Sequence, residues 1–265
     1  MFSIYTSLYN LDNGFIDWKE ALNNFCAFAD EVVIATLPKD EQILIDYTHP
    51  GWTSNHFKLV VCKDISLDDL AFDGKLKNAA LKACTHPFCI LLDGDERIDV
   101  KDRKKWEIWA ERLNKMDDID ALFIPVVDLF HSEREYKSLG KKWYMHKNLP
   151  NLHRGVVNFA RKSNGKIDHT QSDTCELIYN NGNLVRSSST LYPHNYVTID
   201  LLKYADSIYV WHMGWLDKEK RLKSNSFWQP VWNNRAGEEV KNIIHSKEKL
   251  DKIEYFPHGL KLWYE

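Results

Sequence analysis

Two aspartates separated by a single glycine, Asp93 and Asp95, directly follow the apolar stretch Phe88–Leu92. Because side chains alternate along extended backbone, residues two apart point toward the same side. Neighbouring carboxylates repel each other unless a cation or a proton relieves the repulsion. Mg²⁺ and Mn²⁺ prefer oxygen ligands and are often shared with substrate phosphates, so the pair indicates a divalent-ion site that also binds a diphosphate. The alternative is a solvated acidic turn, since Asp-Gly is common in turns.

The first half of the chain supplies the elements that would carry this pair. Four strands are predicted, at Ser3–Leu8, Glu31–Thr36, Lys58–Cys62 and Phe88–Leu92. Three amphipathic helices are predicted, one starting at Asp17 and two at Asp73–Cys84 and Val100–Lys115. The spacing of Asp17 and Glu20 is typical of a capping box. Strands that alternate with such helices predict βαβ units in a mostly parallel sheet, whose ligands bind beyond the carboxyl ends of the strands.

The second half of the chain has a different pattern. Ala121–Phe130 is predicted to be a strand at a sheet edge or with a bulge, because it contains Pro125. The segment Asn180–Asn183 separates two short apolar runs and is typical of a hairpin turn. A last strand is predicted at Ile208–Trp211, and a polar helical stretch from Asp217 onward. No clear linker separates the halves, so we predict one domain.

Composition excludes several classes of protein. A formal net charge of −3 gives no electrostatic case for binding nucleic acid or an anionic membrane. The five cysteines form no Cys-x-x-Cys pair, which argues against zinc ribbons and disulfide scaffolds and favours a reducing compartment. Residues 1–10 lack the features of a secretory signal, and no apolar run approaches the ~20 residues of a transmembrane helix, so we expect a cytoplasmic protein.

Several motifs, in their order along the chain, resemble those of GT-A glycosyltransferases of the family 2 type. They are the Thr-Ser-Leu-Tyr-Asn exit of the first strand, the Val-Val-Ile-Ala-Thr strand, the Lys75-x-x-Asn78 helix and the Ile-Leu-Leu-Asp-Gly-Asp-Glu strand. The resemblance covers residues 1–130. It extends to His212-Met213-Gly214-Trp215, which looks like the C-terminal histidine of these enzymes.

This resemblance implies a GT-A fold, which is an α/β, Rossmann-like architecture with a mostly parallel central sheet flanked by helices. Residues 1–130 would form the nucleotide-binding half of a single domain spanning 1–265. Residues 131–265 would form an antiparallel and helical acceptor-side half. The implied activity is the transfer of a sugar from a UDP- or GDP-linked donor to a glycan or other hydroxyl acceptor, with Mn²⁺ or Mg²⁺ as cofactor.

The family's functional residues can be carried over by position. Asp95 would be the main metal ligand, together with Asp93 and His212. The residues implied to bind the nucleotide sugar are Thr6, Leu8, Asn10, Thr36, Lys75, Asn78, Asp93, Gly94, Lys218 and Arg221. Many relatives have an acidic residue where this chain has Thr36, so the identity of the donor's nucleobase is left open. Each of these roles has a purely structural alternative. His212 could only support its strand, and Lys75 and Asn78 could belong to a solvated helix face.

The catalytic base is a separate question. An inverting transferase needs a carboxylate that takes the proton of the acceptor hydroxyl, because neutral alcohols are poor nucleophiles. Asp173 and Glu176, in Ser-Asp-Thr-Cys-Glu, best match the family's acidic pair, and Asp168 is another candidate. The standard Glu-Asp doublet is missing, and a retaining enzyme would need no such base.

Other functions give different patterns. A nucleotidyltransferase would want a glycine-rich phosphate loop after the first strand, which residues 6–10 do not provide. A phosphatase of the haloacid-dehalogenase type has its Asp-x-Asp strand first in the domain and Thr or Val where this chain has Arg97. An EF-hand needs glycine at the position of Ile98. A non-catalytic carbohydrate-binding protein would use aromatic platforms, for which Trp143, Tyr144, Trp211 and Trp215 are candidates.

Overall fold

The computed structural model describes two stretches of the chain in most detail, 2–117 with short gaps and 207–215. The described residues are 2–14, 16–47, 56–68, 72–117, 121–130, 132–147, 152–156, 176–180, 183–186, 196–198, 207–215, 220 and 254–255. For much of the second half only the backbone is described. No helix in these ranges is long and apolar enough to cross a membrane.

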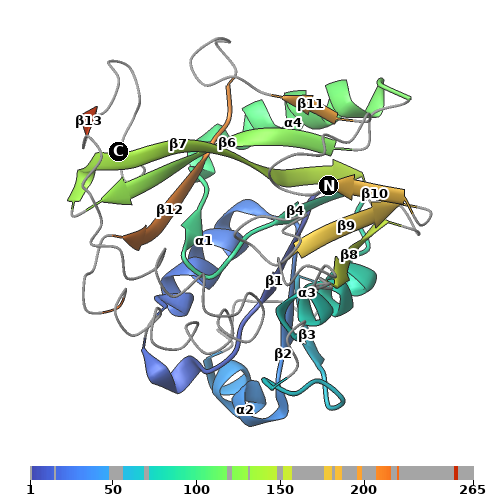
Figure 1. Ribbon diagram of the computed structural model, residues 1–265, viewed down its shortest axis with the longest axis vertical. Coiled ribbons are helices and arrows are strands. Elements are labelled where there is room, and N and C mark those ends of the chain that lie inside the picture. The colour runs from blue at the N-terminus through green and yellow to red at the C-terminus, as the bar shows by residue number, and fades with distance from the viewer. Residues whose placement is uncertain are drawn as a thin grey trace, which may run out of the picture.

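A large mixed sheet with the strand order β3-β2-β1-β4-β7-β6-β12-β5 forms the centre of the protein (Figure 1). Its strands are β1 (Phe2–Ser7), β2 (Glu31–Thr36), β3 (Phe57–Val61), β4 (Phe88–Leu91), β5 (Glu96–Arg97), β6 (Ala121–Phe130), β7 (Ser132–Lys147) and β12 (Val210–Trp215). β1 to β4 are parallel to one another. β7 is antiparallel to β4 and β6, and β12 runs parallel to β6. The fold is therefore α/β, with a parallel nucleus and a mixed extension.

Helices cover both faces of the parallel strands. They are α1 (Trp18–Phe28), α2 (Pro38–Tyr47), α3 (Phe72–Ala83) and α4 (Arg103–Asn114), with short 3₁₀ turns at Leu11–Asn13 and Val100–Asp102. Alternate strand residues such as Ile4 and Val32 pack in one core cluster with α1, α2 and α4. Their neighbours Tyr5 and Val33 pack in a second cluster with α3. Because both faces are covered, β1, β2 and β4 are buried along their whole length.

A second, three-stranded antiparallel sheet contains β8 (Leu152–Val156), β9 (Glu176–Asn180) and β10 (Asn183–Arg186). β9 and β10 form the hairpin predicted around Asn180–Asn183. β8 lies against α3, so this sheet adjoins the parallel half of the main sheet (Figure 1). Two further short strands, β11 (Tyr196–Thr198) and β13 (Glu254–Tyr255), pair with β6 and β7.

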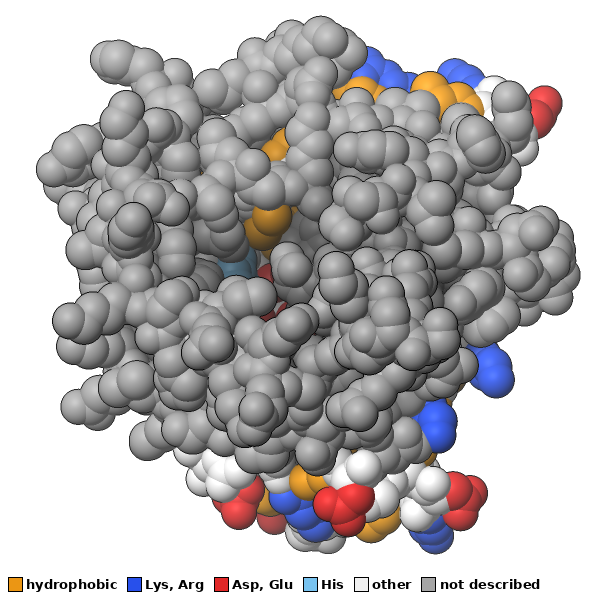
Figure 2. Space-filling view, in the orientation of Figure 1, with side chains coloured by type: hydrophobic (Ala, Val, Ile, Leu, Met, Phe, Trp, Pro, Cys, Tyr) orange, Lys and Arg blue, Asp and Glu red, His pale blue; other side chains and the backbone are white. Residues whose placement is uncertain are grey.

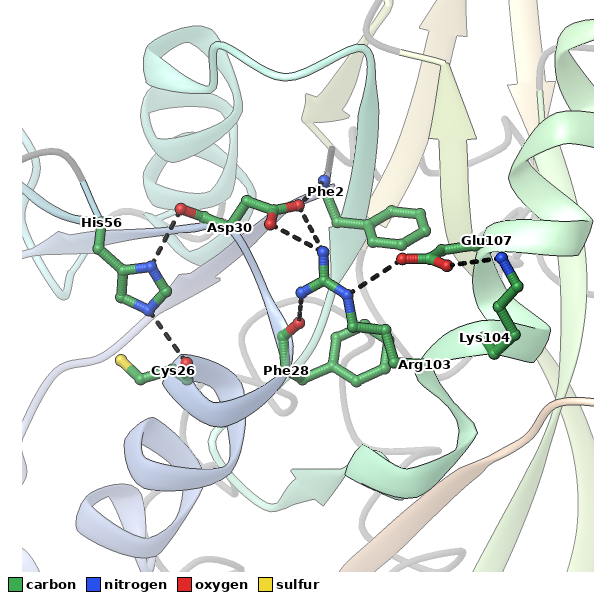
Figure 3. Close-up of polar contacts among 8 residues, drawn as sticks. All are labelled: Phe2, Cys26, Phe28, Asp30, His56, Arg103, Lys104 and Glu107. Atoms are coloured by element: carbon green, nitrogen blue, oxygen red, sulfur yellow. Dashed lines mark hydrogen bonds and ion pairs between the residues drawn. The ribbon is translucent and has the colours of Figure 1, made fainter.

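A polar network ties α4 to the amino-terminal end of β1 (Figure 3). The guanidinium of Arg103 donates from Nη2 to both carboxylate oxygens of Asp30, at 2.7 and 2.9 Å, and from Nη1 to the carbonyl of Phe28. The same carboxylate accepts the main-chain N–H of Phe2 at 2.8 Å. Arg103 also lies over the ring of Phe2, 5.8 Å from its centroid. These contacts hold the end of α1, the start of β1 and the start of α4 together.

The four strands and three helices predicted for the first half are confirmed, with small shifts at their ends. Ala121–Phe130 was predicted to be a strand at an edge or with a bulge. It is not at an edge, because β6 lies between β7 and β12, but its register against β7 is irregular, as a bulge would make it. On one side of β6, β11 pairs only as far as Phe123 and β12 pairs only from Val126. Among the described residues, no strand is therefore paired beside Pro125 on that side, so its missing N–H is tolerated. The register shifts of β6 against β7 fall elsewhere, next to Leu122 and beyond Asp128.

Two further differences concern helix starts. Asp17 precedes α1 but makes no capping hydrogen bond, so the predicted capping box does not form. Its carboxylate pairs with Lys220 instead, and Glu20 lies 3.6 Å from Arg97. The sequence pattern also failed to predict α2, which begins at Pro38. The helical stretch predicted from Asp217 lies almost entirely outside the described residues.

Candidate active site

The carboxyl ends of β1, β2 and β4 meet at one edge of the sheet. Ser7 is paired with Ala35 across β1 and β2, and Tyr5 with Leu91 across β1 and β4. The chain beyond each strand stays close, since the N–H of Leu8 donates to the carbonyl of Ala35 at 3.0 Å. The exits of the three strands therefore lie side by side, which is where parallel sheets bind ligands.

Asp95 and His212 are brought together at this edge. Asp95 Oδ2 and His212 Nε2 are 3.2 Å apart, although 117 residues separate them in sequence. A short antiparallel ladder of β12 with β5 positions His212 opposite Glu96, and the N–H of Met213 donates to the carbonyl of Asp95 at 2.8 Å. Figure 2 shows a histidine side chain next to acidic side chains on the face drawn.

Gly214 leaves room for this pair. A Cβ built on Gly214 would lie 2.8 Å from both Asp95 Oδ2 and His212 Nε2. Any larger residue at position 214 would therefore occupy the space next to these two atoms. The space that Gly214 leaves beside the carboxylate and the imidazole is compatible with a bound cation, because an ion needs open volume beside its ligands.

The atoms of this pair suit Mn²⁺ or Mg²⁺, which take carboxylate oxygens and, for Mn²⁺, also imidazole nitrogen. In the part of the chain that the structure describes, no three His, Cys, Asp or Glu side chains form a group able to hold a metal ion. Asp93 is the predicted ligand that does not join the other two, since its Oδ1 lies 2.6 Å from Lys77 Nζ. Two protein ligands are compatible with an ion that completes its shell with substrate phosphates and water.

A buried lysine next to Asp93 was not predicted. Lys77 is only 4% exposed, and its Nζ lies 3.0 Å from Asp73 Oδ2 and 2.6 Å from Asp93 Oδ1. Asp73 is in turn held by the hydroxyl of Ser7, which donates to its Oδ1 at 2.7 Å. The i,i+4 spacing of Asp73 and Lys77 is the sequence signal that could have indicated this pair. Lys75, which was predicted to face the site, is exposed.

The other predicted residue of α3, Asn78, is half-buried. Its side-chain oxygen Oδ1 is fully buried and has no hydrogen-bond partner within the described ranges. A buried acceptor of this kind usually has a partner, so Asn78 Oδ1 is a group that could accept a hydrogen bond from a ligand or a water.

The exit of β1 is held by a carboxylate that the sequence pattern did not single out. Asp40, at the start of α2, accepts the main-chain N–H groups of Asn10 at 2.9 Å and Leu11 at 3.0 Å. Asn10 has a φ of 54°, a left-handed conformation that asparagine tolerates better than most residues. Asp40 therefore fixes the backbone of a segment that was predicted to contact the nucleobase.

Two of the residues predicted to contact nucleotide are fully buried. Thr36 donates its hydroxyl to the carbonyl of Leu8 at 2.7 Å, so it supports the exit of β1 from within. Thr6 lies within β1, and its hydroxyl has no hydrogen-bond partner among the described residues. Neither side chain presents its hydroxyl to solvent. Leu8 and Asn10 are buried at the same exit, and Gly94 packs against Leu8 so closely that a Cβ there would lie 3.0 Å from Leu8 Cδ2.

Several predicted residues fall outside what can be located. Asp173, Asp168, Lys218 and Arg221 lie outside the described residues, and Glu176 is placed only by its backbone, at the start of β9. Among the candidate stacking rings, Trp211 is fully buried in a small cluster with Val127 and Leu129, so it serves the core. The side chains of Trp143, Tyr144 and Trp215 are not described.

Comparisons with known proteins yield structural likenesses alone. No protein-family model and no curated protein matches the chain. The chain is similar to S. aureus TarS 1–349, with 16% identity and a TM-score of 0.38 over 56% of this chain and 47% of that chain. A complex of TarS 1–349 with UDP-GlcNAc matches with 20% identity and a TM-score of 0.36 over 48% of this chain and 35% of that chain.

HddC from Yersinia pseudotuberculosis is also similar, with 11% identity and a TM-score of 0.38 over 85% of this chain and 99% of that chain. This chain thus spans less than half of the TarS 1–349 chains that it matches. At such low identities and TM-scores, these likenesses decide neither the fold nor the activity of this chain.

Proposed function

We propose that this protein is a metal-dependent glycosyltransferase, which moves a sugar from a nucleotide-diphosphate sugar to an acceptor hydroxyl. The observation that carries the proposal is the pairing of Asp95 Oδ2 with His212 Nε2, 3.2 Å apart at the carboxyl edge of the parallel strands. The order of motifs along the chain supports it, as does the space that Gly214 leaves beside the two atoms. UDP- and GDP-linked sugars are both candidate donors.

Asp95 and His212 would hold Mn²⁺ or Mg²⁺ through one carboxylate oxygen and one imidazole nitrogen. When bound, the ion would neutralise the charge that develops on the departing nucleoside diphosphate. Lys218 and Arg221, which follow β12 in the chain, are proposed to contribute further positive charge to the diphosphate. Because Asp93 is paired with Lys77, it is proposed to face the sugar and ribose part of the donor instead of the ion.

The nucleoside would lie against the exits of β1 and β2. Asp40 holds the backbone of Asn10 and Leu11 there, and Thr36 holds Leu8, so this wall of the site is formed before any ligand arrives. The buried Oδ1 of Asn78, which has no partner among the described residues, is an acceptor that a donor hydroxyl or a bound water would satisfy. A preformed wall reduces the conformational entropy lost on binding.

The acceptor is proposed to bind over the second half of the chain. The three-stranded sheet of β8, β9 and β10 adjoins α3, the helix that carries Lys77. Asp173 lies three residues before Glu176, which is the first residue of this sheet's β9. For an inverting reaction, one of these carboxylates would take the proton of the acceptor hydroxyl as the oxygen attacks the anomeric carbon.

The proposal is tested by incubating the protein with UDP- and GDP-sugars, with Mn²⁺ or with a chelator, and measuring release of nucleoside diphosphate. We expect slow Mn²⁺-dependent release by the wild type, loss of release in Asp95→Asn, and no change in Asp46→Asn, a matched substitution at an exposed site on α2. Release of pyrophosphate from a nucleoside triphosphate with a sugar phosphate would instead identify a nucleotidyltransferase. Binding without any release would identify a carbohydrate-binding protein.

A further inference from the structure

One arginine lies inside the candidate site and is not used by the proposed function. Arg97 directly follows the acidic loop, which we define as Asp93–Glu96, and its side chain is only 1% exposed. Arginine is almost never fully buried unless its charge and its N–H groups are paired. The partners of this guanidinium therefore indicate what its burial achieves.

One half of the guanidinium faces the acidic loop. Nη1 donates to the carbonyl of Gly94 at 3.1 Å and to the carbonyl of Glu96 at 2.8 Å. Gly94 and Glu96 are the immediate neighbours of Asp95 in the chain, so a single nitrogen holds the backbone on both sides of the candidate metal ligand. The N–H of Asp93 is also held, by the carboxylate of Glu96 at 2.8 Å.

The other half of the guanidinium faces the beginning of α1. Nη2 donates to the carbonyl of Asp17 at 3.0 Å and lies 3.6 Å from Glu20 Oε2. The main chain of Arg97 is paired with Trp211, the residue before His212, in the ladder between β5 and β12. Arg97 thus connects the three segments that carry Asp95, His212 and the start of α1.

The charge of Arg97 matters as well as its hydrogen bonds. Burial lowers the pKa of the guanidinium, while the nearby carboxylates of Glu20, Asp95 and Asp17 raise it again. A buried cation close to Asp95 offsets the repulsion among the carboxylates of the acidic loop. This offset is present before any metal ion arrives, so the loop can hold its conformation without one.

We propose that Arg97 is a positioning residue, which fixes the acidic loop so that Asp95 meets His212 in the geometry that a divalent ion requires. The inference rests on the proposed function, because it concerns the metal site of that function. Groups that orient a metal ligand through hydrogen bonds typically change metal affinity about 10- to 100-fold when they are removed. A planar guanidinium reaches acceptors in several directions at once, which the ammonium of lysine does not.

The experiment is a titration with Mn²⁺ followed by electron paramagnetic resonance, in which the signal of the free ion falls on binding. It uses the full chain with UDP and, separately, with GDP. We expect Arg97→Lys to bind Mn²⁺ about 10- to 100-fold more weakly than the wild type. The matched control is Arg103→Lys, which changes the bidentate contact to Asp30 outside the site and should leave Mn²⁺ affinity unchanged (Figure 3).

A second variant keeps the inference testable if Arg97→Lys does not fold. Glu20→Gln removes a partner of Arg97 whose side chain is 64% exposed, so it should fold normally. We expect it to weaken Mn²⁺ binding about two- to fivefold. Unchanged Mn²⁺ affinity in every Arg97 and Glu20 variant that folds would overturn the role of Arg97 alone. Absence of Mn²⁺ binding by the wild type would overturn the proposed function and this inference together.

Discussion

The ammonium of Lys77 bridges two carboxylates from different parts of the chain, and its contact with Asp93 is the shorter, at 2.6 Å. Asp73 belongs to the same helix, whereas Asp93 belongs to the loop after β4. The lysine therefore ties α3 to the acidic loop and takes Asp93 away from the pair formed by Asp95 and His212. The two aspartates of the Asp-Gly-Asp motif consequently have different partners, a lysine for the first and a histidine for the second.

Replacing this lysine should cost stability as well as binding. Lys77→Met leaves Asp73 with a buried negative charge whose cation is gone, and removing one partner of a buried ion pair typically costs about 3 kcal/mol of unfolding free energy. Lys75→Met, at an exposed position of the same helix, is the matched control and should cost little. Urea denaturation measures both. Equal unfolding free energies of the two variants would show that the buried contacts of Lys77 contribute nothing.

The position of Lys77 also shows where prediction from the sequence reached its limit. The helix at Asp73–Cys84 was predicted correctly, but its buried face was assigned to apolar residues alone. In the structure, that face includes Asp73 and Lys77 together with Leu76 and Ala80. Charged residues indicate a solvated face unless they neutralise each other, and the i,i+4 spacing of Asp73 and Lys77 is a local signal for one such pair. The second carboxylate that neutralises Lys77, that of Asp93, comes from a loop that is distant in sequence. Local pattern cannot reveal such a partner.

The same reasoning explains other successes and failures. β2 and β4 were predicted because strands covered on both faces tend to have continuous apolar sequence, as in Val32–Ala35 and Phe88–Leu91. α2 was missed, although it begins at Pro38 and proline is favoured at the first position of a helix, because proline also commonly follows the end of a strand. His212 was linked to Asp95 only through the family resemblance, since the contact depends on the pairing of β5 with β12.

His212 should matter more in the presence of metal than in its absence. If its imidazole completes an Mn²⁺ shell, His212→Ala will weaken binding of UDP or GDP in Mn²⁺ and change it little with a chelator present. Thermal shift at several nucleotide concentrations measures this, because a ligand that binds the native state raises its melting temperature. An equal loss with and without Mn²⁺ would assign His212 a structural role instead.

Gly214 should be unable to accept even a methyl group without loss of the metal site. In Gly214→Ala the new Cβ would lie 2.8 Å from Asp95 Oδ2 and His212 Nε2, so one of them must move. We expect Mn²⁺-dependent nucleotide binding to fall by at least about tenfold, the scale of other changes in ligand orientation.

The control for Gly214 is Gly14→Ala. That glycine has a positive φ of 63° and nothing within 4 Å of the added Cβ. It should lose about 1 kcal/mol of stability through backbone strain and keep its Mn²⁺ response. Retention of full Mn²⁺ affinity by Gly214→Ala would show that the space beside the pair is not needed.

Acid should destabilise the protein through Glu31. Burial raises the pKa of this carboxyl, but contacts from Lys58, Ser3 and Thr85 outweigh that effect and lower the pKa from its ordinary value of 4.5 to about 2. A lowered pKa in the folded state stabilises the protein at pH values above 4.5, and this contribution is lost as the pH falls toward 2. The difference corresponds to roughly 3 kcal/mol.

The variant Glu31→Gln tests this assignment. It should be less stable than the wild type at pH 7, and its unfolding free energy should vary less between pH 5 and pH 3, which urea denaturation across that range measures. Glu111→Gln, at an exposed position on α4, should follow the wild-type profile. A profile for Glu31→Gln that is parallel to the wild type would place the acid sensitivity elsewhere.

The catalytic base is predicted from the sequence alone, because Asp173 lies outside the described residues. An inverting transfer requires a carboxylate within hydrogen-bond reach of the acceptor hydroxyl, and the nucleotide is proposed to occupy the first half of the chain. Asp173 comes just before β9, whose sheet adjoins α3.

Loss of a general base typically lowers the rate ~10²–10⁴-fold, whereas loss of a surface carboxylate should change it little. We therefore expect Asp173→Asn to keep the donor and Mn²⁺ affinities of the wild type and to lose most sugar transfer. The measurement is the initial rate of transfer, together with the affinity for the donor. Wild-type transfer by this variant, or failure to bind donor, would remove Asp173 from the role of base and leave Glu176 or a retaining mechanism.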